Sequence, residues 1–99
     1  MNTFRDPIDR NYQMLPEHMQ SGARLYVEDG VEPGSFLTYV LCNDFKSLCL
    51  SADDINIRCL SKWGTWVLDY CPAEAQGSHR TVEEWVETGG LKGAMEDDD

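Results

Sequence analysis

One segment decides the fold class of this chain: residues 35–50, which read SFLTYVLCNDFKSLCL. Its apolar residues recur at spacings of one, three and four, which is the period of an amphipathic α-helix. Tyr39 and Leu50 widen the apolar surface, so more than one flank of this helix should be buried. With Ser35 as its N-cap, the segment is predicted to be the central helix of the fold, and its apolar positions are Phe36, Leu37, Val40, Leu41, Phe45, Leu48 and Cys49.

Three further helices are predicted, over residues 16–28, 53–70 and 79–88. Pro16 stands at the first turn of the first helix, where proline is well tolerated. The second of the three must stop before Pro72, because proline disfavours the helical conformation of the residue before it. A Gly-Gly pair ends the last helix.

The 99 residues make one domain at most, and their composition is that of a globular protein. No alternating run indicates a strand, and no internal repeat is visible. The predicted fold class is therefore all-α: a compact bundle of four short helices over residues 15–91. An extended N-terminal arm is expected at residues 1–14, and a disordered acidic tail at residues 92–99.

The cysteines and histidines show no recognisable catalytic or metal motif. The four cysteines form no Cys-x-x-Cys pair, so no zinc site is predicted. Cys49 and Cys59 lie on predicted apolar faces and are expected to be buried thiols. His18 and His79 lack an adjacent nucleophile arrangement, although Cys71 with His79 stays open as a formal candidate. We predict a protein that is not an enzyme and needs no cofactor and no metal.

Three aromatic residues share one predicted helix, Trp63, Trp66 and Tyr70, and Trp85 lies on the next. Most of them should belong to the core. Trp63 lies at the edge of the apolar stripe, and tryptophan is one of the residues that dominate binding hot spots. We expect Trp63 to be exposed as a contact anchor.

The charge balance is strongly acidic, with 18 acidic and 8 basic side chains and a formal net charge of −10 at pH 7. This argues against direct binding to a phosphate backbone, which needs clustered Lys and Arg. No stretch approaches the roughly 20 apolar residues of a membrane span, and no secretory signal is visible. Two interpretations of the acidic residues stay open: a solubilising surface, or mimicry of nucleic-acid phosphates toward a basic partner.

Several short runs carry a resemblance to a known family: LPEHM at 15–19, RLYVEDG at 24–30, PGSFL at 33–37, and a closing Trp85 with GGL at 89–91. The pairs Asn-Asp at 43–44 and Ala-Asp at 52–53 belong to the same pattern. Together they resemble a family of small uncharacterised proteins encoded by tailed phages and prophages, over residues 15–91. The resemblance implies a viral accessory protein in the host cytoplasm and supplies no catalytic residues. The predicted helix at 53–70 departs from the family pattern.

The phage setting favours a protein that acts by binding. We expect an inhibitor or modulator of a host nucleic-acid-handling protein, of anti-CRISPR or anti-restriction type, that works by stoichiometric occlusion of a basic surface. The alternative is a self-assembling phage accessory or scaffold protein that forms a homodimer through an apolar helix face. The predicted partner-binding residues of the first hypothesis are Asp29, Glu32, Asp44, Asp53, Asp54 and Trp63.

Overall fold

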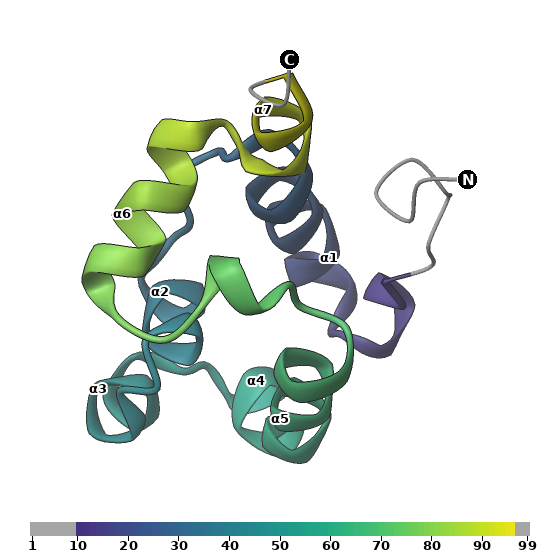
Figure 1. Ribbon diagram of the computed structural model, residues 1–99. Helices are drawn as coiled ribbons and strands as arrows, with labels where there is room; N and C mark the ends of the chain where they lie inside the picture. The colour runs from purple at the N-terminus through teal and green to yellow at the C-terminus, as the bar shows by residue number, and fades with distance from the viewer. Residues whose placement is uncertain (1–9, 97–99) are drawn as a thin grey trace.

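The computed structural model describes residues 10–96, and every regular element in that range is helical (Figure 1). The predicted all-α fold class is confirmed. In chain order the elements of the described range are η1 (Tyr12–Met14), α1 (Glu17–Arg24), η2 (Leu25–Asp29), α2 (Ser35–Leu41), α3 (Phe45–Ser51), α4 (Asp54–Arg58), α5 (Leu60–Asp69), η3 (Ala73–Ala75), α6 (His79–Thr88) and α7 (Gly90–Glu96).

The first predicted helix is present as α1 continued by η2. Ala23 and Tyr26, three residues apart on its inner face, are fully buried. The last turn, η2, widens to a π-helical turn, and Gly30 ends it with a positive φ of 69°. A positive φ at the end of a helix is the conformation that glycine adopts at least cost.

The predicted central helix is two helices, α2 and α3. Asn43 separates them with φ 60°, a left-handed conformation that asparagine tolerates better than most residues. Asp44 then starts α3, because its carboxylate accepts a hydrogen bond from the backbone N–H of Ser47 at 3.2 Å. The apolar period runs on across the break, and for that reason the pattern alone predicts one helix. At the start of α2 the N-cap is Gly34 rather than Ser35.

The next predicted helix is also divided, into α4 and α5, at Cys59, whose φ of −106° and ψ of 18° interrupt the helical backbone. Asp53 caps α4 by accepting from the backbone N–H of Asn56 at 2.8 Å. The last predicted helix is confirmed as α6. Ser78 caps it by accepting from the N–H of Thr81 at 3.1 Å, and Gly89 closes it at φ 90°. The count of four helices is therefore wrong, although their four sequence regions are helical.

Both ends of the described range are more ordered than predicted. Tyr12 is buried and lies in η1, so residues 12–14 of the expected arm belong to the packed domain. At the other end, residues 92–96 of the expected disordered tail continue α7, which packs against η2. Leu91 is buried there. Residues 1–9 of the arm and 97–99 of the tail lie outside the described residues.

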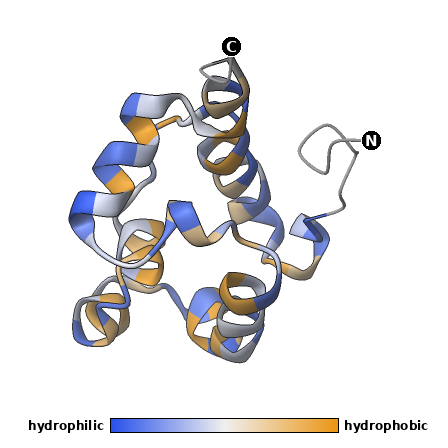
Figure 2. Cartoon of the chain, viewed as in Figure 1, coloured by the Kyte–Doolittle hydropathy of each residue, from blue (hydrophilic) through white to orange (hydrophobic). Residues whose placement is uncertain are grey.

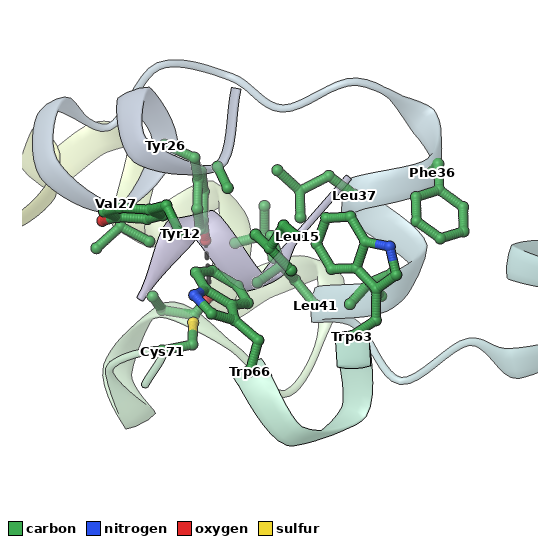
Figure 3. Close-up of a cluster of buried hydrophobic side chains, with 14 of the residues drawn as sticks. Tyr12, Leu15, Tyr26, Val27, Phe36, Leu37, Leu41, Trp63, Trp66 and Cys71 are labelled. Carbon is green, nitrogen blue, oxygen red and sulfur yellow. Dashed lines mark hydrogen bonds between the residues drawn. The ribbon is translucent and has the colours of Figure 1, made fainter. Parts of the chain in front are cut away.

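The core is built around tryptophan and tyrosine rings (Figure 3). Trp63 is 1% exposed, so the prediction of an exposed contact anchor is wrong. Its ring meets Phe36 edge-on at 5.4 Å and Trp66 at 6.1 Å between centroids, a geometry that aromatic pairs prefer. Trp63 of α5 therefore connects this helix to α2.

Buried polar groups of these aromatic residues have partners. The indole N–H of Trp66 donates to the carbonyl of Arg10 at 2.9 Å. That of Trp85 donates to the carbonyl of Tyr26 at 3.0 Å, and the Tyr26 hydroxyl donates to the carbonyl of Ala75 at 2.7 Å. An unpartnered buried donor would cost about 1–3 kcal/mol, so these bonds fix the packing of the rings.

Two glycines allow η2 to touch the junction of α6 and α7. A β-carbon on Gly30 would stand 2.6 Å from the carbonyl carbon of Gly89, closer than real β-carbons approach backbone. Gly90 lies on the other side of this contact, because a β-carbon there would collide with the backbone nitrogen of Gly30, and its φ is 71°. The contact holds α7 beside η2, and Lys92 pairs with Asp29 at 2.7 Å next to it.

Apolar residues are not confined to the interior. Figure 2 shows apolar residues on α3, α4 and α5, which lie together at the end of the molecule opposite α7. No helix within residues 10–96 combines the length and the hydropathy needed to cross a membrane. The large apolar side chains exposed on α3, α4 and α5 are Phe45, Leu50, Ile55, Ile57 and Leu68.

Candidate functional site

Two grooves and one polar network are the candidate sites in the described residues. The first groove, here called the acidic groove, lies between the loop that precedes α2 and one face of α6, and its volume is about 520 Å³. The face of α6 follows the helical period, because its lining positions are three or four residues apart. The lining residues are Glu32, Pro33, Thr38, His79, Val82, Glu83, Val86 and Glu87.

The acidic groove combines carboxylates with methyl groups. Glu32, Glu83 and Glu87 are exposed, whereas Val82 is buried and Val86 half-buried. Lysine and arginine lay their aliphatic stems on apolar surface and keep the charged end near water or a carboxylate. A groove of this kind therefore suits a basic side chain of a partner.

The predicted acidic residues lie at separate helix ends. Asp29 lies in η2 beside α7, whereas Asp44, Asp53 and Asp54 begin α3 and α4 at the opposite end of the molecule (Figure 1). Three of them have partners in the chain: Asp29 pairs with Lys92, Asp44 caps α3, and Asp53 caps α4. Of the predicted acids, Glu32 alone is among the residues that line the acidic groove.

Sequence reasoning missed Glu83 and Glu87 as candidate binding residues. Their spacing of four on α6 places them on one face of that helix. Their proximity to Glu32 depends on how the loop at 31–34 packs against α6, and the sequence carries no direct signal of that contact.

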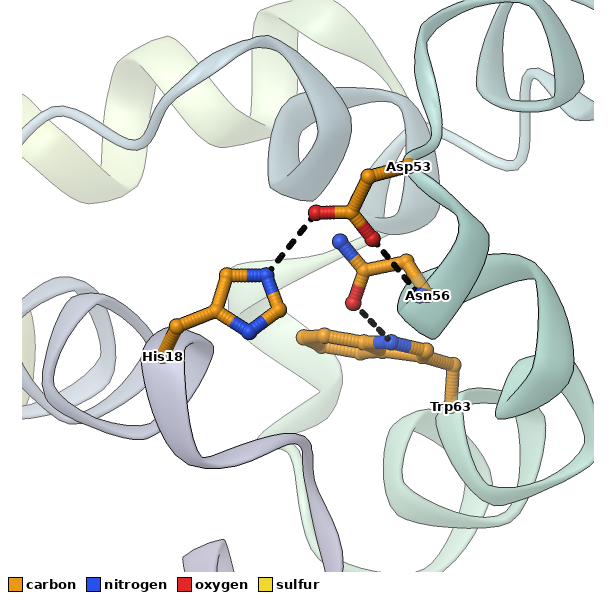
Figure 4. A network of polar contacts seen from close by, with 4 residues as sticks. All are labelled: His18, Asp53, Asn56 and Trp63. Carbon is orange, nitrogen blue, oxygen red and sulfur yellow. Dashed lines mark hydrogen bonds and ion pairs between the residues drawn. The ribbon is translucent and has the colours of Figure 1, made fainter.

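A polar network joins α1 to α4 and α5 (Figure 4). His18 Nε2 and Asp53 Oδ2 are 3.0 Å apart, and Asp53 Oδ1 accepts from the backbone of Asn56. Asn56 Oδ1 in turn accepts from the indole N–H of Trp63 at 3.2 Å. The hydrogen bond from the Asn56 backbone, and then His18, holds the pKa of the Asp53 carboxyl below its usual value.

This network shapes the structure and offers no evident chemistry. His18 and Asp53 are both on the surface, and the network contains no serine or cysteine to act as a nucleophile. Among residues 10–96, no three side chains of His, Cys, Asp or Glu are grouped so that they could hold a metal ion. The polar network fixes the position of Trp63, which forms part of the second groove.

The second groove, here called the apolar groove, lies between α3 and α5 and has a volume of about 510 Å³. Phe45 is 68% exposed on one side of it, and Leu68 is 83% exposed on the other. Gly64 lies between them in the middle of α5. Other apolar lining residues include Tyr39 of α2, Leu48, Leu60 and Trp63, and the predicted partner-binding residue Asp44 is the charged residue in the lining.

The cysteines differ from the prediction. Cys49 is exposed and Cys59 half-buried, so neither is the fully buried thiol that was expected. Cys49 lies within α3, and Cys59 lies at the break between α4 and α5. Cys71 is the buried one, and desolvation raises the pKa of its thiol to about 12. A thiol that stays protonated is a poor nucleophile, which does not support the Cys71–His79 pair.

Comparison with protein-family models, with curated proteins and with solved structures finds no match to this chain. The resemblance to small phage and prophage proteins therefore stays a prediction. Function has to be inferred from the two grooves and from the charge of the chain.

Proposed function

We propose that this protein is a small acidic interaction protein that binds a basic surface of a host nucleic-acid-handling protein. It inhibits or modulates that protein by stoichiometric occlusion, as an anti-CRISPR or anti-restriction protein of a phage would. The observation that carries the proposal is the acidic groove, which Glu32, Glu83 and Glu87 line together with the methyl groups of Val82 and Val86 on α6. A net charge of −10 adds long-range attraction toward a positively charged partner.

The structure changes which residues take part. Trp63 is buried and no longer belongs to the proposed surface. Glu32 is kept, and Glu83 and Glu87 join it. Asp54 is exposed and is kept as an acid that attracts a partner at long range. Asp29, Asp44 and Asp53 are kept in the same role, although each also has a partner in the chain.

The experiment is capture from a bacterial lysate with the full chain as bait, at low and at moderate salt, followed by mass spectrometry. A charge-reversed triple variant, Glu32→Lys with Glu83→Lys and Glu87→Lys, is compared with the wild type. The matched control reverses three exposed acids outside the groove and has the same net charge: Glu17→Lys, Asp69→Lys and Glu74→Lys.

The expected result is one nucleic-acid-binding protein that the wild type and the control retain and that the groove variant loses. Retention should fall as salt rises, because exposed charges are screened. If the groove variant and the control capture the same protein equally well, the acidic groove is not the binding site. If no nucleic-acid-binding protein is retained by the wild type, the proposed function is wrong.

A second candidate function is a self-assembling phage accessory or scaffold protein whose acids only keep it soluble. The exposed apolar residues of α3, α4 and α5 favour it. The same experiment separates the two, because a solubilising surface should be indifferent to which three acids are reversed.

A further inference from the structure

Gly64 is a helix residue that the fold of the chain does not require. It lies inside α5, where glycine is among the least favourable residues. A β-carbon at this position would meet no described atom within 4 Å, so close packing inside the chain does not explain the glycine. Glycine in such a place lets another backbone or side chain approach closely. The space above Gly64 is the apolar groove.

The apolar groove combines an open space above Gly64 with the projecting side chain of Leu68. Leu68 lies one helical turn after Gly64 on the same face of α5, and it projects into solvent with 83% of its surface exposed. Consider two copies whose α5 helices pack antiparallel about a two-fold axis that passes between Gly64 and Leu68. Leu68 of each copy would then lie over Gly64 of the other copy. Such self-complementarity is what an isologous dimer interface requires.

The charge around the groove also suits a second copy of the same chain. Residues 45–69, which comprise α3, α4 and α5, hold three basic residues and three acidic residues and have no net charge. The remainder of the chain therefore carries the whole net charge of −10. Two copies that meet at this end bring together surfaces of low net charge, with Asp44 as the charged residue in the groove lining, and keep their strongly acidic surfaces apart.

We propose that the apolar groove binds a second copy of this chain, so that the protein is an isologous dimer. Leu68 of each copy fills the groove of the other, over Gly64 and beside Phe45. The dimer leaves the acidic groove free, since that groove lies between α6 and the loop before α2. The proposal is independent of the proposed function, because an inhibitor can bind its target as a monomer or as a dimer.

The test is sedimentation equilibrium of the full chain over a wide range of concentration. The wild type is expected to reach twice the chain mass of 11.3 kDa. Leu68→Glu should weaken dimerisation at least about ten-fold, because a carboxylate would be buried in an apolar groove without a partner. Gly64→Leu should do the same by filling the hollow, and its β-carbon has open space in the monomer.

The matched control is Leu50→Glu. Leu50 is 82% exposed on α3 and is not among the residues that line the groove, so the change in charge and the exposure are the same. This variant should dimerise like the wild type. Circular dichroism of each variant checks that the helices are intact.

Three results would overturn the proposal. A wild type that stays monomeric at every concentration excludes a second copy as the occupant. A Leu68→Glu variant that dimerises like the wild type places any dimer interface elsewhere. Equal weakening by Leu50→Glu and Leu68→Glu indicates unspecific association of the apolar end. None of these results bears on capture by the acidic groove, so the two proposals fail separately.

Discussion

Trp63 donates its indole N–H to the side-chain oxygen of Asn56, 3.2 Å away, and both residues are almost completely buried. The bond links α5 to α4 across the break at Cys59. Trp63 also lines the apolar groove, so the hydrogen bond to Asn56 fixes the position of a residue in the lining of that groove. Asn56 is in turn held by Asp53, whose side chain caps the helix that carries it.

Asn56→Ala should lower the free energy of unfolding by about 1–3 kcal/mol, because it leaves the indole N–H of Trp63 buried without an acceptor. Chemical denaturation followed by tryptophan fluorescence measures the change. Gln13→Ala, which deletes an exposed amide, is the control and should change stability little. Equal stability of Asn56→Ala and the wild type would show that the bond does not hold Trp63.

The close contact between η2 and the start of α7 predicts a large effect at Gly90. Gly90→Ala should destabilise the protein by about 2 kcal/mol or more, since alanine is strained at φ 71° and its β-carbon would collide with the backbone of η2. Thermal and chemical unfolding both measure this loss. The control is Gly22→Ala in α1, where a β-carbon meets no described atom within 4 Å; it should stabilise the helix by up to about 1 kcal/mol. If both variants are equally stable, α7 is not held at this contact.

The hydrogen bonds to Asp53 predict a pH-dependent contribution to stability. They hold the pKa of its carboxyl below the usual value, so the contribution is complete above the unfolded pKa of about 4 and is lost as pH falls through the folded pKa. Asp53→Ala should therefore be less stable than the wild type at pH 7, and the difference should shrink in acid. Denaturation curves at pH 7 and pH 3 compare the two.

Asp54 is the matched control for this pH effect, because it is an exposed neighbour in the first turn of the same helix. Asp54→Ala should show a smaller loss at pH 7. If Asp53→Ala lowers the free energy of unfolding equally at pH 7 and pH 3, the ionised carboxylate is not the source of the stabilisation.

Thiol labelling should distinguish the cysteines by burial. A maleimide reagent is expected to modify exposed Cys49 first in the native protein, whereas Cys71 should react only on unfolding, because burial raises the pKa of its thiol to about 12. Peptide mass spectrometry after timed labelling gives the order. Early modification of Cys71 in the folded protein would show that this part of the core opens readily.

Much of the fold can be predicted from the sequence because the signals are local. Pro16, Ser78 and the glycines at 30 and 89 mark helix ends by their own backbone preferences or capping hydrogen bonds. The apolar pattern hides the break at Asn43, because apolar residues keep a helical period on both sides of it. The Asn-Asp pair at 43–44 was the available signal: asparagine tolerates a left-handed backbone, and aspartate caps the helix that follows.

The candidate sites were less predictable than the fold, because they depend on which faces meet in three dimensions. The position of Trp63 at the edge of the stripe on α5 suggests exposure, yet Phe36 of α2 and Asn56 of α4 cover it. Leu68 belongs to the same helix and is the exposed residue instead. The acidic groove needs α6 and the loop at 31–34 side by side, which no local pattern reveals.

The measurement that tests the central claim most directly is a titration of this protein against the nucleic-acid binding of the host protein that it captures. Anisotropy of a labelled oligonucleotide reports binding, and the charge-reversed variant of Glu32, Glu83 and Glu87 is titrated in parallel. Occlusion of a basic surface predicts complete release of the oligonucleotide near equimolar protein, and little release by the variant. An oligonucleotide that stays bound at a large excess of the wild type would contradict it.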